Sequence, residues 1–275
     1  MPRLIRAALE ASGVRNPERA SSGVDVIGDI AIVRLAEFSH REKRKVAGAL
    51  LDELKNVRVI MEQEGGIAGE FRLRKLRHLA GERRTLTIHK ENGCSFKVDV
   101  AKCYFSPRLS TERLRVAHEV RKREKVLNMF AGVGPFSITI ARAAGAHVTS
   151  CEINGFAAKL HRENNKLNKV EALVEVLAVD AGELPSMSKE KFDRVLMPLP
   201  EKADAFLPAA LSMAKKGALL HYYRHMLGED EAEASDSLGV ELDGMLPKGV
   251  RYQVRRVREV GPRWLEMAAD IRLPR

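Results

Sequence analysis

The sequence lacks an apolar run long enough to cross a membrane, because none approaches the roughly 18 residues that a spanning helix needs. The first six residues also lack the long apolar segment of a secretion signal. The three cysteines, Cys94, Cys103 and Cys151, are odd in number and have no metal-ligand spacing, which favours reduced thiols and gives no metal site. We therefore expect a cytoplasmic protein that has no membrane contact.

Basic residues outnumber acidic ones, 47 to 37, and the formal net charge is +10 at pH 7. A basic surface attracts polyanions, because each phosphate that it neutralises releases condensed counterions. The alternative is a charge that serves only solubility. Because the basic residues are clustered, the composition favours a nucleic acid partner.

The first part of the chain predicts an N-terminal arm over residues 1–23 and a small α+β domain over residues 24–103, which we expect to bind or support RNA. Its apolar residues alternate or recur at helical spacing. The expected elements are a hairpin over 24–33, a helix over 40–55, a strand over 57–61, a loop beginning at Gly65-Gly66 and a hairpin over 85–100.

Residues 104–275 predict a second domain in which strands and helices alternate. Ser110 is expected to cap a helix over 111–122. The later elements are strands over 125–130, 147–151, 172–179, 193–197 and 218–223, helices over 135–144, 155–167 and 203–214, a loop or helix over 228–242, and closing antiparallel strands over 249–260 and 264–273. This order predicts an α/β fold with a doubly wound, mostly parallel, Rossmann-like sheet.

The stretch 125–136 predicts a buried strand that ends at glycines and passes directly into a helix. Gly132 and Gly134 would let a ligand approach the backbone amides at the helix N-terminus. The third glycine of the dinucleotide pattern is missing, and no Gly-Lys-Ser/Thr follows, which excludes a P-loop.

Two carboxylates follow the next two predicted strands. Glu152 comes about twenty residues after the glycines, where a carboxylate can accept hydrogen bonds from both ribose hydroxyls. Asp180 follows the third strand, where it could bind an adenine amine. Alone, Glu152 could be a solvated loop residue, but the series of three features fits S-adenosylmethionine at least as well as NAD.

Four segments resemble the archaeal and eukaryotic tRNA (guanine-N1)-methyltransferases, which act on the guanosine 3′ to the anticodon. They are Tyr104-Phe-Ser-Pro-Arg-Leu-Ser-Thr-Glu-Arg113, Asn128-Met-Phe-Ala-Gly-Val-Gly-Pro-Phe136, Asn164-Asn-Lys-Leu-Asn168 and Gly217-Ala-Leu-Leu-His-Tyr-Tyr223. The resemblance covers about residues 24 to 273. It implies a class I methyltransferase sheet, S-adenosylmethionine as cofactor and the tRNA anticodon stem-loop as partner. We expect a monomer.

Methylation of guanine N1 requires removal of its proton and stabilisation of the charge that grows on O6, which a carboxylate base and an arginine can provide. The resemblance implies that Glu112 is the base. It also implies that Arg72 is the cation, with Arg74 as the other possible register. The alternatives to these catalytic roles are simpler. Glu112 would be a carboxylate in the first turn of a helix, where the helix dipole favours it, and Arg72 would be one of many phosphate contacts.

The remaining candidates divide into two groups. The cofactor-binding candidates are Tyr104, Asn128, Phe130, Gly132, Gly134, Glu152, Asn154, Asp180 and Pro200. The substrate-binding candidates are Arg74, Phe105, Arg108, Arg113 and Pro198. Tyr104 and Phe105 could stack on a base, although a place in the core is a close alternative.

Two departures from the family pattern keep other functions open. Pro198 stands where the family usually has an asparagine that can contact the guanine, and Asn128 stands where an aspartate is common. One alternative is a wybutosine-type aminocarboxypropyltransferase, which uses the same cofactor. The other is an RNA-binding relative with weak catalysis.

Overall fold

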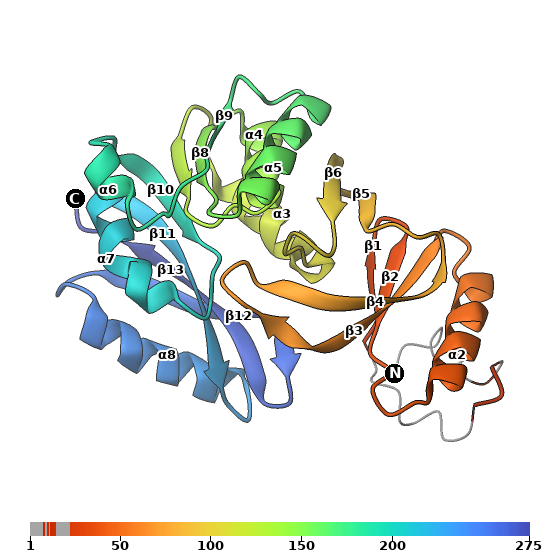
Figure 1. Ribbon diagram of the computed structural model, residues 1–275. Helices are drawn as coiled ribbons and strands as arrows, with labels where there is room; N and C mark the ends of the chain where they lie inside the picture. The colour runs from red at the N-terminus through yellow and green to blue at the C-terminus, as the bar shows by residue number, and fades with distance from the viewer. Residues whose placement is uncertain (1–7, 9, 11, 15–22) are drawn as a thin grey trace. The chain divides into compact units, whose positions relative to one another are not determined.

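The computed structural model describes residues 8, 10, 12–14 and 23–275, so most of the expected arm over 1–23 lies outside the described residues (Figure 1). Packing divides the chain into two compact units, residues 1–107 and 108–275. The first is called the N-terminal unit and the second the C-terminal unit.

The N-terminal unit contains a four-stranded sheet in the order β1-β2-β3-β4 and a separate two-stranded hairpin, β5-β6. The strands are β1 (Asp25–Ile27), β2 (Ile30–Val33), β3 (Val59–Ala68), β4 (Leu73–Gly81), β5 (Leu86–Glu91) and β6 (Cys94–Asp99). Helix α2 (His40–Glu53) connects β2 to β3, which therefore pair in parallel. The predicted hairpins and helix are confirmed.

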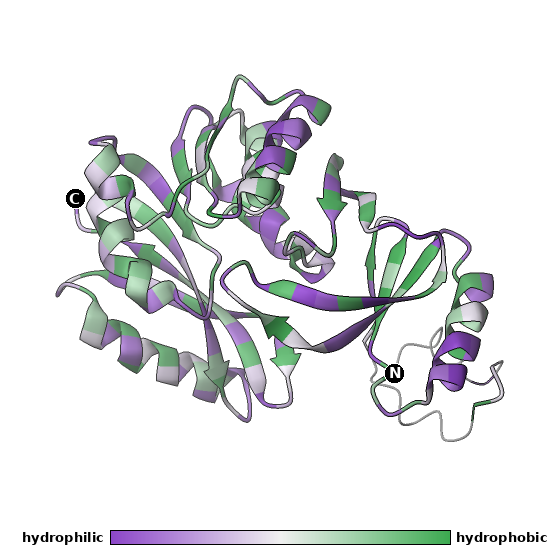
Figure 2. Cartoon of the chain, viewed as in Figure 1, coloured by the Kyte–Doolittle hydropathy of each residue, from purple (hydrophilic) through white to green (hydrophobic). Residues whose placement is uncertain are grey.

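Helix α2 begins where the sequence provides a capping box. Ser39 accepts a hydrogen bond from the Glu42 amide, and the Glu42 carboxylate accepts one from the Ser39 amide at 2.8 Å. Val46 and Leu50 bury the inner face of the helix. In Figure 2, strand β2 is green along its length and the first turns of α2 are purple, as expected for a buried strand beneath an amphipathic helix.

The expected loop at Gly65-Gly66 is wrong. Strand β3 continues through both glycines to Ala68 and pairs with β4. The pairing register shifts between Gln63 and Ile67, so the glycines occupy an irregularity within a long hairpin. Glycine patterns that mark a loop in sequence can equally mark a bulge.

The C-terminal unit is built on a seven-stranded sheet in the order β12-β13-β11-β10-β7-β8-β9. Its strands are β7 (Lys125–Asn128), β8 (His147–Cys151), β9 (Val174–Leu177), β10 (Phe192–Met197), β11 (Ala214–Leu227), β12 (Arg251–Gly261) and β13 (Trp264–Arg272). Only β13 runs antiparallel to its neighbours. The predicted α/β class, the mostly parallel sheet and the antiparallel closing strands are confirmed.

The helices of this unit are α3 (Ser110–Glu119), α4 (Pro135–Ala144), α5 (Gly155–Leu167), α6 (Leu184–Met187), α7 (Ala203–Met213) and α8 (Glu231–Met245). Helices α7 and α8 run along one side of the sheet in Figure 1, away from α3, α4 and α5. The core between sheet and helices contains Leu127, Val195, Leu207 and Leu238.

The predicted cap of the helix after residue 110 is wrong. Ser110 is the first helical residue, Leu109 occupies the N-cap position without a side-chain hydrogen bond, and α3 ends at Glu119. The reason is that a 3₁₀ turn, Pro107–Leu109, leads directly into the helix.

The strand order places a topological switch point between β7 and β10, since the connections from these neighbours lead to opposite sides of the sheet. Ligands of open α/β sheets bind outside the carboxyl ends of the strands at such a point. The glycine loop, residues 129–134, leaves β7 at this position.

Candidate functional site

The glycine loop ends in a backbone conformation that requires glycine. Gly134 has φ +93° at the N-cap of α4, and Pro135 follows at the first helical position. A Cβ atom on Gly134 would lie 2.3 Å from Cδ2 of His161. Both the dihedral angle and the neighbouring ring therefore exclude a side chain.

Helix α5 holds this loop in place. His161 is completely buried and packs against Gly134, and burial lowers its pKa to about 3, so its ring is neutral. Asn164 Nδ2 donates a hydrogen bond to the carbonyl oxygen of Val133 at 2.9 Å. In the sequence Asn164 stands out only as part of a family motif, and no local signal predicts this contact.

Glu152 joins the two loops at the predicted cofactor edge. Its Oε2 accepts a hydrogen bond from the Gly132 amide at 2.6 Å, and its Oε1 accepts one from the Asn154 amide at 2.8 Å. Burial raises the pKa of this carboxyl, although both backbone hydrogen bonds oppose the shift. The structure thus brings Gly132, Glu152 and Asn154 together at one edge of the sheet.

Asn128 is completely buried beneath the glycine loop. Its Nδ2 donates to Ser137 Oγ at 3.0 Å, and Ser150 Oγ donates to the same oxygen at 2.8 Å. A neutral amide suits a position without water better than an unpaired carboxylate would. Asn128 therefore joins the end of β7 to the start of α4, on either side of the glycine loop.

Other candidates near this edge make local contacts of their own. Asn154 caps α5 by accepting hydrogen bonds from the Phe156 and Ala157 amides. Asp180 Oδ1 accepts one from the Gly182 amide at 2.7 Å. Phe130 packs edge-to-face on Phe206 of α7, with ring centroids 4.9 Å apart. Pro198 is half-buried and Pro200 buried in the turn that follows β10.

All three cysteines are buried and free, as expected. Cys151 ends β8 directly before Glu152 and is completely buried. Burial first, and then the charges of Asp180 and Glu152, raise the pKa of its thiol to about 12. Because the charge of Asp180 raises the pKa of Cys151, the Asp180 carboxylate lies close to this edge.

Glu112 lies in the first turn of α3 and is 7% exposed. Its Oε1 accepts hydrogen bonds from Tyr223 Oη at 2.7 Å, Arg255 Nη2 at 2.8 Å and Arg115 Nη2 at 2.9 Å. Burial raises the pKa of the Glu112 carboxyl, whereas Tyr223 and Arg115 act in the opposite direction. The carboxylate is therefore desolvated and held in a fixed orientation.

The glycine loop is linked to Glu112 through aromatic packing. Phe136, in the first turn of α4, lies 6.1 Å from the ring of Tyr223, which donates to Glu112. Arg113 is buried with its guanidinium 5.9 Å from the centroid of Phe136. These contacts place the predicted base beside the predicted cofactor loop.

A partly buried ion-pair network extends from Glu112 along the sheet. Arg115 contacts both Glu112 and Asp270, and Asp270 accepts a hydrogen bond from His221 Nδ1 at 2.5 Å. His221 Nε2 in turn accepts one from Arg194 at 2.6 Å. Glu119, His221 and Asp270 approach within 4.8 Å, as metal ligands would. Because Arg115 and Arg194 already bind this cluster, it is an ion-pair network.

In the N-terminal unit the structure brings Arg72 and Tyr104 together. The Arg72 guanidinium lies over the Tyr104 ring, 4.2 Å from its centroid. Arg72 has φ +54°, a left-handed conformation that is strained for a residue with a side chain. Arg72 ends the turn between β3 and β4, where its amide donates a hydrogen bond to the Gly69 carbonyl oxygen at 3.1 Å.

Arg74 and Phe105 have structural surroundings. Arg74 is 9% exposed and pairs with Asp25 at 2.8 Å. Phe105 is 3% exposed and packs edge-to-face on His89 at a centroid distance of 5.0 Å. The Arg74 guanidinium is therefore engaged within the N-terminal unit, and the ring of Phe105 belongs to the core of that unit. Arg108 is exposed.

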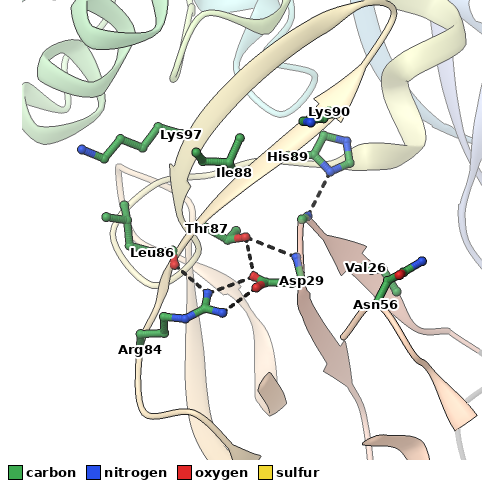
Figure 3. A pocket seen from close by; sticks show the side chains of 11 residues that line it. Val26, Asp29, Asn56, Arg84, Leu86, Thr87, Ile88, His89, Lys90 and Lys97 are labelled. Carbon is green, nitrogen blue, oxygen red and sulfur yellow. Dashed lines mark hydrogen bonds and ion pairs between the residues drawn. The ribbon is translucent and has the colours of Figure 1, made fainter. Parts of the chain in front are cut away.

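A separate pocket of about 980 Å³ lies in the N-terminal unit, between the β1–β2 turn and β5 (Figure 3). Asp29 accepts hydrogen bonds there from Arg84 and from Thr87 at 2.7 Å. The Gly28 amide donates to His89 Nδ1 at 3.1 Å. These polar groups satisfy one another, and none of the sequence candidates lines the pocket.

Among the described residues, no helix has the length and apolar composition that crossing a membrane requires. Two family models match the chain. The TRM5/TYW2 methyltransferase domain matches residues 87–236, and the TYW2 N-terminal domain matches residues 5–85.

Curated relatives cover most of the chain. Trm5b from Pyrococcus abyssi, a tRNA (guanine(37)-N(1))-methyltransferase, is 40% identical over 90% of this chain and 74% of its own length. Trm5b from Methanocaldococcus jannaschii is 37% identical over 92% of this chain and 71% of its own. A tRNA(Phe) (4-demethylwyosine(37)-C(7)) aminocarboxypropyltransferase from Pyrococcus horikoshii is 36% identical over 72% of this chain and 69% of its own.

Solved structures agree with these relatives. A complex of aTrm5 with tRNALeu has a TM-score of 0.84 and 34% identity, and covers 96% of this chain and 77% of the other. The structure of M. jannaschii TYW2 with AdoMet has a TM-score of 0.66 and 26% identity, and covers 92% of this chain and all of the other. The chain therefore belongs to the TRM5/TYW2 methyltransferase family, which confirms the resemblance found in its motifs.

Proposed function

We propose that this protein is a tRNA (guanine37-N1)-methyltransferase that uses S-adenosylmethionine. The observation that carries the proposal is the position of Glu112, a buried carboxylate linked through Tyr223 and Phe136 to the glycine loop. The two Trm5b relatives, at 40% and 37% identity, bear the same activity in their names.

The residues at the sheet edge fit an adenosyl cofactor. Glu152 retains acceptor capacity, because each carboxylate oxygen has more than one lone-pair direction and receives one backbone hydrogen bond here. It can therefore accept from the ribose hydroxyls, while Asp180 is assigned the adenine amine. When bound, S-adenosylmethionine supplies an electrophilic methyl group on its sulfonium.

Glu112 acts as the general base in this proposal. It takes the proton from guanine N1, which frees the N1 lone pair for the methyl group that bound S-adenosylmethionine would supply, leaving S-adenosylhomocysteine. A desolvated carboxyl with a raised pKa suits this role, because its pKa is closer to the working pH. Arg72, whose guanidinium lies over the Tyr104 ring, is assigned the charge on O6 because the family resemblance implies that role.

The N-terminal unit is assigned to binding the anticodon stem-loop, together with the exposed Arg108. The protein is proposed to act in the cytoplasm as a monomer. Sedimentation of the protein with and without tRNA checks the stoichiometry, since a complex with two protein chains per tRNA contradicts it.

A second candidate is aminocarboxypropyl transfer to a wybutosine precursor. Two observations favour it: residues 5–85 match a TYW2 N-terminal domain, and Pro198 cannot donate a hydrogen bond to guanine. Aminocarboxypropyl transfer differs from methyl transfer in which carbon attached to the sulfonium is attacked.

Two labelled cofactors distinguish the candidates. The protein is incubated with tRNA transcripts that carry guanosine at position 37, and with tRNA that carries the wybutosine precursor there. If the label of the cofactor methyl group is recovered in the RNA as 1-methylguanosine, the proposed function is supported. Label from the cofactor carboxyl group in RNA supports the second candidate, and label in neither RNA contradicts both.

A further inference from the structure

The sheet of the C-terminal unit carries an open groove at its carboxyl edge. The groove has a volume of about 490 Å³ and begins at Pro200, in the turn that follows β10. Its other wall includes Val260 and Trp264, on either side of the β12–β13 turn. Pro200 is a cofactor candidate, whereas Val260 and Trp264 have no role in the chemistry described above.

Strand pairing puts the groove at the same edge as the glycine loop. Met197, the last residue of β10, pairs in parallel with Tyr222 of β11. Two residues farther on, β11 presents Arg224 and His225 to the groove, and its last residue, Leu227, pairs with Trp264. The groove thus lies beyond the carboxyl ends of β10 and β11, where substrates of such sheets bind.

Helix α7 connects the groove to the glycine loop. Phe206 of α7 packs on Phe130 of the loop, with centroids 4.9 Å apart. Asp204, in the first turn of the same helix, pairs with Arg224 of the groove at 3.2 Å. The groove and the cofactor loop are therefore separated by one turn of one helix.

The groove contains the single tryptophan of the sequence, and the wall that carries it, with Val260 and Gly261, is apolar. Trp264 is 46% exposed and Val260 39% exposed, although both are large apolar residues. An indole with an open face is the side chain best suited to stacking on a base, and such stacking tolerates any base.

The charges around the groove disfavour a phosphate as its occupant. Arg224 pairs with Asp204 and with Glu241 at 3.3 Å, so two carboxylates outnumber the one guanidinium. Glu201 lies 3.9 Å from His225 Nδ1 with its side chain 45% exposed. A carboxylate at the rim can accept a hydrogen bond from an exocyclic amine of a base.

We propose that Trp264 and Val260 stack a nucleobase of the substrate RNA, one of the two that flank the methylated guanosine. This inference rests on the proposed function, because it assumes an RNA whose target guanosine enters at the edge of β7 and β10. Unstacking a guanosine leaves its neighbours without a partner, and an aromatic groove at the same edge supplies one. Trp264 is thus assigned to substrate positioning.

The single tryptophan makes the test direct. Fluorescence of the wild-type protein, with S-adenosylhomocysteine present, is followed during titration with an anticodon stem-loop transcript that carries guanosine at position 37. Two further transcripts have an abasic site on the 5′ or the 3′ side of that guanosine. We expect quenching with the intact RNA and its loss with one of the two abasic RNAs.

Variants give a second measurement. Trp264→Ala should weaken RNA affinity by about 5- to 150-fold, the range expected for one stacked base, and Trp264→Phe should retain most of the affinity. Leu167→Ala is the matched control, because Leu167 is 49% exposed and ends α5 at the opposite edge of the sheet. Unchanged cofactor affinity in all three variants shows that they are folded.

The possible results separate this inference from the proposed function. Methyl transfer with unchanged tryptophan fluorescence, or with quenching that survives in both abasic RNAs, overturns the stacking role and leaves the function intact. Equal RNA affinity of Trp264→Ala and Leu167→Ala also overturns it. An absence of methyl transfer by the wild-type protein contradicts the function, whereas the fluorescence titration still decides the role of Trp264.

Discussion

Tyr223 donates a hydrogen bond to Glu112 Oε1 across 2.7 Å, and the two side chains are 1% and 7% exposed. This contact joins strand β11 to helix α3. It also lowers the pKa of Glu112 against the larger, opposite effect of burial. The proton affinity of the proposed base therefore depends on a phenol from the sheet.

Replacing Tyr223 by phenylalanine should move the acid limb of the pH–rate profile to higher pH. The base works only when deprotonated, so the rate falls as pH drops through its pKa, and losing the hydrogen bond raises that pKa further. The same change should lower the free energy of unfolding by about 1.5–3 kcal/mol, as for a hydrogen bond to a charged group.

Tyr222→Phe is the control for this prediction. Tyr222 is also buried, but its hydroxyl has no hydrogen-bond partner in the described part of the chain. Its removal should leave the profile unchanged and cost no stability. If the two variants have the same acid limb, Glu112 is not the titrating base.

Glu152→Gln should weaken S-adenosylmethionine binding roughly 10- to 100-fold, because an amide cannot accept hydrogen bonds from both loop amides and the ribose. Isothermal titration with the cofactor measures the effect. Glu175→Gln removes an exposed carboxylate from the neighbouring strand β9 and should change the affinity little. Equal losses in both variants would indicate a general effect of charge.

Gly134→Ala should destabilise the C-terminal unit and abolish cofactor binding. The substitution forces a side chain into the left-handed region and against the His161 ring, which together cost about 2–5 kcal/mol. Gly155→Ala is the comparison, since a Cβ atom at this position would point into open space and the φ angle of Gly155 is ordinary. Calorimetry should show a large loss of melting temperature only for Gly134→Ala.

The N-terminal unit should lose stability in acid through Asp29. Hydrogen bonds from Arg84 and then Thr87 outweigh burial and lower the pKa of Asp29 below its ordinary value of 3.8. A lowered folded-state pKa contributes stability that is present above about pH 4 and lost as pH falls through the lowered value. Asp29→Asn should therefore be less stable than wild type at neutral pH, and the difference should shrink below pH 4.

Glu82→Gln is the control for Asp29, because Glu82 also pairs with Arg84 but is half exposed. Exposed pairs contribute little, so its unfolding curve should follow the wild type at every pH. A difference between Asp29→Asn and wild type that persists at pH 2 would contradict the titration of Asp29.

Local signals explain which elements the sequence predicted well. The predicted bounds of α4 and α5 agree with the structure because Gly134, Pro135 and Gly145 delimit one helix and Asn154 caps the other. Such signals act over a few residues, so they can be recognised without tertiary structure.

The surroundings of Glu112 could not be predicted in this way. The sequence placed it near the cofactor loop, but Tyr223 and Arg255 are 111 and 143 residues away along the chain. Their contacts depend on strand order and register, which no short window of sequence contains. The same limit applies to Asn164, whose contact with Val133 spans 31 residues.

The burial of Cys151 has a consequence for a protein that handles a methyl donor. Thiolates are strong nucleophiles, and a sulfonium beside one would alkylate the protein itself. With a pKa of about 12, only about one Cys151 side chain in 10⁵ is ionised at pH 7. We therefore expect Cys151 to remain unmodified after prolonged incubation with S-adenosylmethionine.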